Sequence, residues 1–355
     1  MVFPAASWLV QTQHAASLAR THADAAAAAT RRSRYNPRKF KHCVAYLSSI
    51  DFGAIAAFLF GLVFGSFLNV VIYRVPRNLS IVKPRSACPN CGTQIRAYDN
   101  IPVVSWIILL GKCRDCGHPI SLRYAIVELS CGFLFVSAYF HAAPLSSTLG
   151  IWTLLKLCTF FFLLLGLIVI DFEHHLLPDV LTLPGLFLGL IFSLIVPVGG
   201  MPGVIARKFL ALRWPLPVIS VIDSAAGAAL GAFFIYAVGE LYFRMRHVEG
   251  MGFGDVKLMG MVGAFLGPKL TLVTIFAGAV LGTIFGLAAT LAVWKKRVRR
   301  RQKRREKHIF GRSWASARLM LRYYEVPFGV FLGSMAILAT FAGNRLVDMY
   351  LGFYH

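Results

Sequence analysis

Long apolar runs recur along the chain and leave few choices of fold. Seven of them approach the roughly 20 residues that an α-helix needs to cross the hydrocarbon core of a bilayer. They are Gly53–Tyr73, Tyr124–His141, Ile151–Ile170, Leu176–Val196, Val221–Phe243, Leu270–Trp294 and Val326–Ala342. Because 57% of the 355 residues are hydrophobic, the chain is too apolar for an ordinary polar surface. The pattern predicts an integral membrane protein.

An eighth, shorter apolar run lies at Val256–Gly267. Alone it is too short to cross a relaxed bilayer. The loop before it, Arg244–Asp255, and the basic stretch after Trp294 are both predicted on the cytoplasmic side, so an even number of crossings must separate them. We therefore expect this run to span as well, thinned or shielded by its neighbours. The prediction is an all-α polytopic membrane protein with about seven to eight transmembrane helices.

The formal net charge of +22 is concentrated in loops, notably Arg74–Arg123 and Lys295–Lys307. Such runs bind phosphate in nucleic-acid-binding proteins, but between spans they favour a cytoplasmic loop against anionic lipid. We therefore expect membrane lipid, and not nucleic acid, as the partner. One basic loop does not fit this preference for the cytoplasmic side, because the even number of crossings places it outside; it contains Arg207, Lys208 and Arg213.

The chain divides by composition into six parts. Residues 1–50 are rich in Ala and Arg and superficially resemble an organellar transit peptide, but a disordered basic extension or a wrongly chosen start codon is the interpretation we favour. A first transmembrane helix is predicted at 51–74, a cytoplasmic minidomain at 75–123 and a membrane core at 124–294. A basic cytoplasmic loop at 295–325 and a last transmembrane helix at 326–355 complete the chain.

Two Cys-x-x-Cys pairs, Cys88 with Cys91 and Cys113 with Cys116, lie in the polar segment between the first two spans. This spacing is typical of a four-sulfur zinc site, and a glycine follows each pair where a knuckle must turn. Two disulfides or a redox pair are the alternative, but they need an oxidising compartment. We expect a structural zinc that gives a small cytoplasmic loop domain its fold. Cys43, Cys131 and Cys158 have no partner spacing and are predicted to be inert.

Acidic residues are scarce, with 15 Asp plus Glu in the chain, and two of them stand at the edges of spans. Asp171 ends the run "FFLLLGLIVID", and Asp255 closes the turn "GMGFGD". Both are predicted at the cytoplasmic boundary, where bundle packing can bring them together. Two partly desolvated carboxyls a few ångströms apart share one proton, as in aspartic proteases.

The glycines before Asp255 allow a substrate strand to approach closely. For each aspartate a simpler interpretation exists: Asp255 as a helix N-cap, and Asp171 as a boundary acid paired with His174 or His175. Their occurrence together in an acid-poor chain favours the pair.

Four further acids receive structural interpretations. Glu173 and Asp179 flank "HHLLPD", and Asp179 is expected to mark entry into the next span. Glu128 and Glu240 lie within apolar runs, where an ionisable residue is functional by default unless it pairs with Arg or a backbone group. We expect Glu128 to be structural.

In order along about 60–333, the motifs resemble those of the prepilin peptidase family, the type IV leader peptidases. They are "GSFLNVVIYRVP", "CPNCG", "YDNIPVVSW", "GKCRDCG", "ISLRY" followed by Glu128, "IDFEHHLLPDVLTLP", "EGMGFGDVKLM" and "VPFGVFLG". The resemblance implies an aspartic endopeptidase of the Gly-x-Gly-Asp type in the bacterial inner membrane, with Asp171 and Asp255 as its catalytic pair. Such enzymes remove the short basic leader of prepilins and pseudopilins on the cytoplasmic side and serve type IV pili or type II secretion.

Many members also methylate the new N-terminus with S-adenosylmethionine. No strand followed by Gly-x-Gly-x-x-Gly marks a site for this methyl donor. The resemblance assigns methyl transfer to the cysteine loop, where Gly111 and Lys112 are the candidate residues. The thiol-stapled minidomain would then hold the new amine.

Three positions depart from the family pattern. Ala125 stands where a proline is common, Glu173 where an aspartate is common, and Val330 where a proline often follows Pro-Phe-Gly. None is expected to touch the two aspartates. The rival hypotheses are a non-enzymatic membrane assembly factor that docks partners through the zinc loop, and a transporter. Against a transporter, no inverted repeat with broken helices is detected.

Overall fold

The computed structural model describes residues 51–142, 145, 147–199, 215–247, 252–303, 314 and 327–352. The expectations for residues 1–50, for Arg207, Lys208 and Arg213, and for most of 304–325 lie outside this part of the chain. The described residues from Gly53 onward belong to one compact unit. Its regular structure is helical, and two isolated β-bridges are the extended pairings among the described residues.

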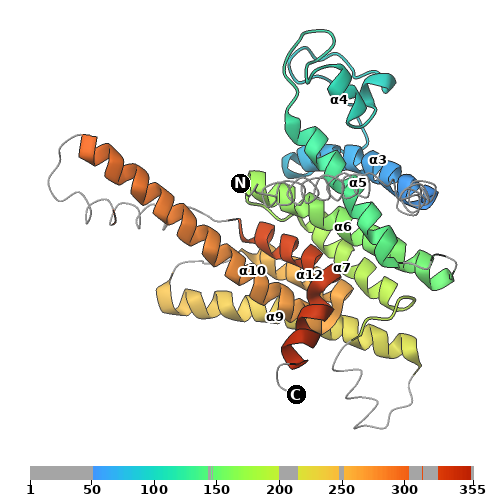
Figure 1. Cartoon of the computed structure of the whole chain (residues 1–355), viewed down its shortest axis with the longest axis vertical. Coiled ribbons are helices and arrows are strands. Elements are labelled where there is room, and N and C mark those ends of the chain that lie inside the picture. Colours follow the sequence, from blue (N-terminus) through green and yellow to red (C-terminus); the bar gives the residue numbers. More distant parts are fainter. Residues whose placement is uncertain are drawn as a thin grey trace, which may run out of the picture. The chain divides into compact units, whose positions relative to one another are not determined.

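Six of the described helices are long and apolar enough to cross a membrane, and a seventh apolar helix is shorter. The six are α3 (Phe52–Arg74), α5 (Leu122–Ala142), α6 (Thr148–His174), α9 (Leu216–Arg246), α10 (Phe253–Lys303) and α12 (Phe328–Gly352); the shorter one is α7 (Asp179–Ser193) (Figure 1). The predicted all-α polytopic membrane fold is confirmed. The helix α10 continues through Lys303, so the first part of the predicted basic loop is helical.

The helix α10 is broken at Gly267, whose φ of 76° and ψ of 174° are not helical, and Pro268 follows it. Met259 and Thr271 stand on opposite sides of this break. Both lie against Gly231 of α9, within 2.4 and 3.0 Å of the position that a Cβ there would take. In an unbroken helix two residues 12 apart would be separated by about 18 Å. The chain therefore turns back at Gly267, and the eighth predicted span forms the first arm of a helical hairpin.

Glycine contacts show that α7 runs parallel to the first arm of α10. A Cβ on Gly185 would lie 2.4 Å from the Met261 sulfur, and one on Gly189, a turn later, would lie 2.8 Å from the Ala264 Cβ. The numbers rise together along both helices. The start of α7 and the start of α10 therefore lie at the same end of the bundle.

The helices α6 and α12 run antiparallel, as shown by two contacts in register. Gly329 of α12 lies against Asp171, and Gly333 lies against Ile168. The last turn of α6 and the first turn of α12 therefore meet, and α7 begins a few residues after α6 ends. This end of the bundle, where α6 terminates and α7, α10 and α12 begin, is called the aspartate end below.

The core is made of large side chains from helices distant in sequence. Phe160 and Phe161 of α6 are fully buried, and the Phe160 ring stacks on Phe265 of α10 with centroids 4.7 Å apart. Exposed large hydrophobics such as Phe187, Phe233 and Phe276 lie on the outside of their helices. An apolar exterior around an apolar core is the pattern of a helix bundle that faces lipid.

Candidate active site and cysteine cluster

Asp171 lies in the last complete turn of α6. The helix ends because His175 adopts a left-handed conformation, φ 51°, and donates its backbone N–H to the Asp171 carbonyl at 2.9 Å. The Asp171 side chain points into the bundle and is 5% exposed. Its Oδ2 accepts a hydrogen bond from the backbone N–H of Val330 at 2.9 Å. A carboxyl bonded to the backbone of α12 and almost without solvent is thus held at the aspartate end.

Val330 is one of the three departures from the family pattern, and the expectation that none of them touches an aspartate is wrong at this position. Proline has no N–H, so a proline here cannot make this hydrogen bond. The contact joins residues 159 apart in sequence, which explains why sequence reasoning missed it.

Asp255 lies inside the first turn of α10, two residues after Phe253 begins the helix. It is therefore not the residue that precedes the helix, where an N-cap would stand. Its side chain is 8% exposed. Gly254 lets the first turn of α10 pack closely against Leu177, because a Cβ on residue 254 would lie 2.8 Å from the Leu177 Cβ. Gly252 accepts a backbone hydrogen bond from Asp255 at 3.1 Å, whereas Gly250 lies outside the described residues.

The two aspartates belong to one site. Leu177, in the turn between α6 and α7, contacts both Gly254, next to Asp255, and Gly329, which lies against the Asp171 carboxyl. Both aspartates are therefore buried around Leu177 at the same end of the bundle. Their action as a catalytic pair, which the sequence predicted for this boundary, stays a prediction.

Four cysteines from the segment between α3 and α5 form a second cluster. Each pair sits on a knuckle of the same design: the N–H of Gly92 bonds to the Cys88 carbonyl, and that of Gly117 bonds to the Cys113 carbonyl, both at 2.9 Å. The two glycines have φ of 72° and 68°, which suit a residue without a Cβ. Cys91 and Cys116, the second cysteine of each pair, contribute the other two sulfurs of the four-cysteine cluster.

One ligand atom from each of the four cysteines lies within 4.8 Å of the others, and the Cys88 and Cys116 sulfurs are 3.8 Å apart. Thiolates around a tetrahedral zinc, with Zn–S bonds near 2.3 Å, stand about 3.8 Å apart. Hydrogen bonding with the side chain and backbone of Thr93 lowers the pKa of Cys91 to about 6, which favours the thiolate that metals bind. The cluster therefore fits a metal ion. Cys131 and Cys158 lie apart from it, in α5 and α6.

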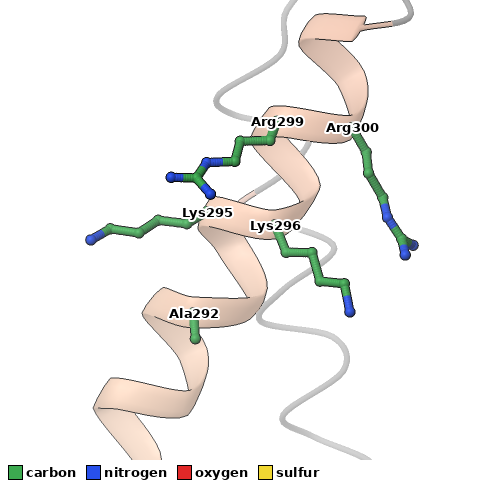
Figure 2. A pocket seen from close by; sticks show the side chains of 5 residues that line it. All are labelled: Ala292, Lys295, Lys296, Arg299 and Arg300. Atoms are coloured by element: carbon green, nitrogen blue, oxygen red, sulfur yellow. The ribbon is translucent and has the colours of Figure 1, made fainter.

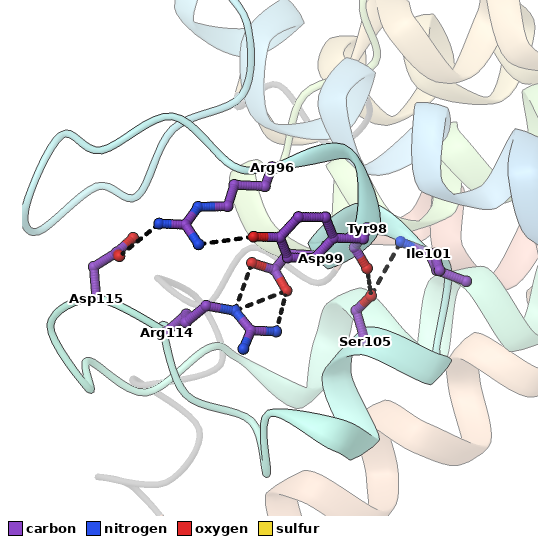
Figure 3. Close-up of polar contacts among 7 residues, drawn as sticks. All are labelled: Arg96, Tyr98, Asp99, Ile101, Ser105, Arg114 and Asp115. Carbon is purple, nitrogen blue, oxygen red and sulfur yellow. Dashed lines mark hydrogen bonds and ion pairs between the residues drawn. The ribbon is translucent and has the colours of Figure 1, made fainter.

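The cysteine minidomain, residues 75–121, is held by a polar network beside the knuckles (Figure 3). Arg114 donates to both carboxylate oxygens of Asp99, at 2.6 to 3.1 Å, and this contact holds the pKa of Asp99 below its usual range. Arg96 donates to the Tyr98 hydroxyl at 2.7 Å and lies 3.7 Å from Asp115. Both arginine contacts thus tie the Cys113–Cys116 knuckle to the segment that follows the first knuckle.

Two family models match consecutive parts of the chain. Residues 59–142 match the bacterial peptidase A24 N-terminal domain, and residues 158–287 match the type IV leader peptidase family. The chain is also similar to curated proteins named "Prepilin leader peptidase/N-methyltransferase". The one from Dichelobacter nodosus is 36% identical over 67% of this chain and 83% of its own length. That from Stutzerimonas stutzeri is 32% identical over 84% and 94%. No solved structure shows a significant match.

The chain belongs to the type IV leader peptidase family. The resemblance read from the motifs is confirmed, and so are the predictions of an enzyme and of a multi-pass membrane protein. The two family models divide the leader peptidase at the α5–α6 loop. The cysteines fall in the first match, and both aspartates fall in the second.

Gly111 and Lys112 occupy different environments in this leader peptidase. Gly111 is buried with φ 65°, and a Cβ there would lie 3.0 Å from the Trp106 ring. The Trp106 ring thus fills the space on the side where a Cβ would stand, and the role of Gly111 in methyl transfer stays a prediction. Lys112 is exposed beside the first ligand of the second knuckle.

Four acids flank or cross the spans, and each has a partner. Glu128 accepts the Val103 backbone N–H at 2.7 Å, in agreement with the structural role predicted for it. Glu240 pairs with Arg244 one turn later, and Glu173 pairs with Arg123. Asp179 pairs with Lys257. Sequence reasoning singled out all four acids but missed the distant cationic partners of Glu173 and Asp179.

Two further buried ionisable residues were missed by sequence reasoning. Lys156 in α6 is 7% exposed and Asp223 in α9 is 3% exposed. The signal was present, because a charged residue inside an apolar run is unusual in a membrane helix. Both stand far from the aspartate end along their helices.

Proposed function

We propose that this protein removes the short basic leader of prepilins and pseudopilins on the cytoplasmic side of the bacterial inner membrane, with Asp171 and Asp255 as the catalytic pair. The observation that carries the proposal is the burial of two carboxyls around Leu177 at one end of the bundle, contributed by α6 and α10. The names of the relatives and the matched family models support it.

The pair can hydrolyse a peptide bond without a metal at the scissile carbonyl. One carboxylate takes a proton from a water molecule as its oxygen attacks the carbonyl carbon, and the protonated partner donates to the developing oxyanion. The tetrahedral intermediate collapses as the C–N bond breaks and the leaving amine takes up a proton. Burial strengthens these electrostatic contacts because little water competes for them.

The position of the pair suits a substrate with a polar leader and an apolar helix. The aspartates lie where membrane helices begin and end, so a scissile bond between the two parts of such a substrate can reach them. Gly252 and Gly254 precede Asp255 and present no side chain to a peptide beside it. The apolar part of the substrate would remain among the lipid-facing helices.

Methylation of the new N-terminal amine is the second proposed activity, with S-adenosylmethionine as the methyl substrate. It is supported by the names of the relatives and by the location of the cysteine minidomain, because Arg123 at its exit pairs with Glu173 at the aspartate end. Gly111 and Lys112 remain the candidate residues for this reaction, and Gly111 also packs against Trp106. Zinc, when bound, would hold the two knuckles together and supply no open coordination position.

Anionic lipid is the proposed partner of the basic end of α10. Lys295, Lys296, Arg299 and Arg300 extend from the helix around a hollow (Figure 2). None of the ion pairs among the described residues includes them. Replacing all four with Gln should weaken binding to vesicles or nanodiscs with anionic lipid by up to about 1,000-fold, at about 1 kcal/mol for each cation near the surface. Equal affinity for neutral and anionic bilayers would contradict the lipid contact.

The proposed peptidase is tested by the cleavage of a prepilin-like substrate in membranes that contain the wild type, Asp171→Asn or Asp255→Asn, with abundance checked by immunoblot. Each substitution should abolish processing at normal abundance, because neither amide can carry the proton. A variant that cleaves at a rate near that of the wild type would show that its aspartate is structural. Methylation is scored separately in the Cys88→Ser, Cys91→Ser double variant, which should lose methylation and keep cleavage.

A further inference from the structure

Each aspartate is followed two residues later by a charged side chain that reaches a different helix. After Asp255 comes Lys257, whose ammonium donates to both carboxylate oxygens of Asp179 at 2.6 and 2.7 Å. Asp179 is the first residue of α7. This ion pair therefore joins the first turn of α10 to the first turn of α7, at the point where the two parallel helices start.

After Asp171 comes Glu173, whose carboxylate pairs with Arg123. Arg123 is the second residue of α5 and follows the cysteine minidomain directly, so this pair joins the last turn of α6 to the first turn of α5. The Arg123 guanidinium also lies 4.7 Å from the centre of the Tyr124 ring. Both partners of the pair are about one quarter exposed, which limits the screening of their charges by water.

The two ion pairs add to the restraints already present at these helix ends, which are the Val330 hydrogen bond to Asp171 and the packing of Leu177. Gly252 and His175, which flank the two helices, are not helical, and terminal turns of helices fray. A misplacement of about 1 Å in a catalytic group can cost about 100-fold in rate. An ion pair one half-turn away from each aspartate opposes this motion without entering the site.

We propose that Lys257–Asp179 and Arg123–Glu173 are positioning ion pairs that hold Asp255 and Asp171 at the separation the reaction needs. This inference rests on the proposed peptidase function. The four residues act through the helix ends and need not touch the substrate. The pairs restrain two different helices, so the loss of either one should be enough to loosen the site.

The test centres on Lys257–Asp179, in the full-length protein in membranes or detergent. Lys257→Met and Asp179→Asn remove one charge each with little change of shape. Each should lower kcat for a prepilin-like substrate about tenfold, with KM nearly unchanged. The double variant Lys257→Met, Asp179→Asn should cost no more than either single one, because both changes remove the same contact. The exchange Lys257→Asp, Asp179→Lys should restore part of kcat.

A matched control is the ion pair Lys269–Asp348, 3.6 Å apart, which joins the second arm of α10 to the last turns of α12 away from the aspartate end. Lys269→Met should leave kcat unchanged. Thermal unfolding of each variant separates loss of position from loss of fold, since partly exposed ion pairs contribute little to stability.

The outcomes separate this inference from the peptidase itself. Inactive Asp171→Asn with a wild-type kcat for Lys257→Met and Asp179→Asn would overturn the positioning role and leave the peptidase standing. Additive losses in the double variant would also overturn it, because independent effects are not those of a pair. Full activity of Asp171→Asn and Asp255→Asn would overturn both the catalytic pair and its positioning.

Discussion

The aspartate end and the cysteine minidomain are built in opposite ways. The cysteine cluster draws all four thiols from the 29 residues Cys88–Cys116, and most of its contacts are local backbone hydrogen bonds. The aspartate end is assembled from the ends of helices that stand far apart in sequence, and its side chains are buried. A metal-held loop can fold from its own residues, whereas a helix-held site exists only once the bundle has formed.

Removal of the metal should produce the largest difference between the two regions. Chelation, or the double variant Cys88→Ser, Cys91→Ser, should unfold residues 75–121, because a loop of this size buries little apolar surface. The membrane helices should persist. Limited proteolysis and circular dichroism would report the two outcomes, and metal analysis should find about one zinc for each wild-type chain. A minidomain that resists protease without metal would contradict this division.

Gly329→Ala should affect the aspartate end alone. The added methyl would lie 2.9 Å from the Asp171 Oδ2 and 3.1 Å from Leu177, so the carboxyl must move. We expect cleavage to fall by roughly 10- to 100-fold while metal content is unchanged. The control is Gly286→Ala in α10, where no atom lies within 4 Å of the added Cβ. Equal rates in the two variants would show that the Asp171 environment tolerates displacement.

Val330→Pro should have a smaller effect at the same end. Val330 is the third residue of α12, where proline is tolerated in the first turn, so the main change is the loss of its N–H to Asp171. A hydrogen bond to a charged group contributes about 1.5–3 kcal/mol, so we expect the rate of cleavage to fall roughly tenfold or more, or the pH at which the rate is half-maximal to shift. Val330→Ala keeps the N–H and serves as control. Unaltered cleavage in the proline variant would show that this hydrogen bond is dispensable.

The same contrast explains how much could be predicted from the sequence. The cysteine spacing and the apolar runs are local signals, and they predicted the gathering of the four cysteines and the helical fold. The even number of crossings expected between two cytoplasmic loops predicted a span at Val256–Gly267. The turn at Gly267 fits this prediction, because α10 reverses its direction there. The pairing of Lys257 with Asp179, and of Val330 with Asp171, depends on how helices pack. Such packing is decided by side-chain shape at positions such as Gly185 and Gly329, which no periodicity reveals.

The turn at Gly267 has a consequence for the compartments on the two sides of the bilayer. Without it, α10 would be one rod, and everything after Leu266 would emerge on the far side from Asp255. With it, the basic end of α10 returns to the side on which Asp255 begins the helix. A single glycine with positive φ thus decides on which side of the bilayer the rest of the chain emerges. A bulkier residue at position 267 should disturb the orientation of that part of the chain more than the stability of the fold.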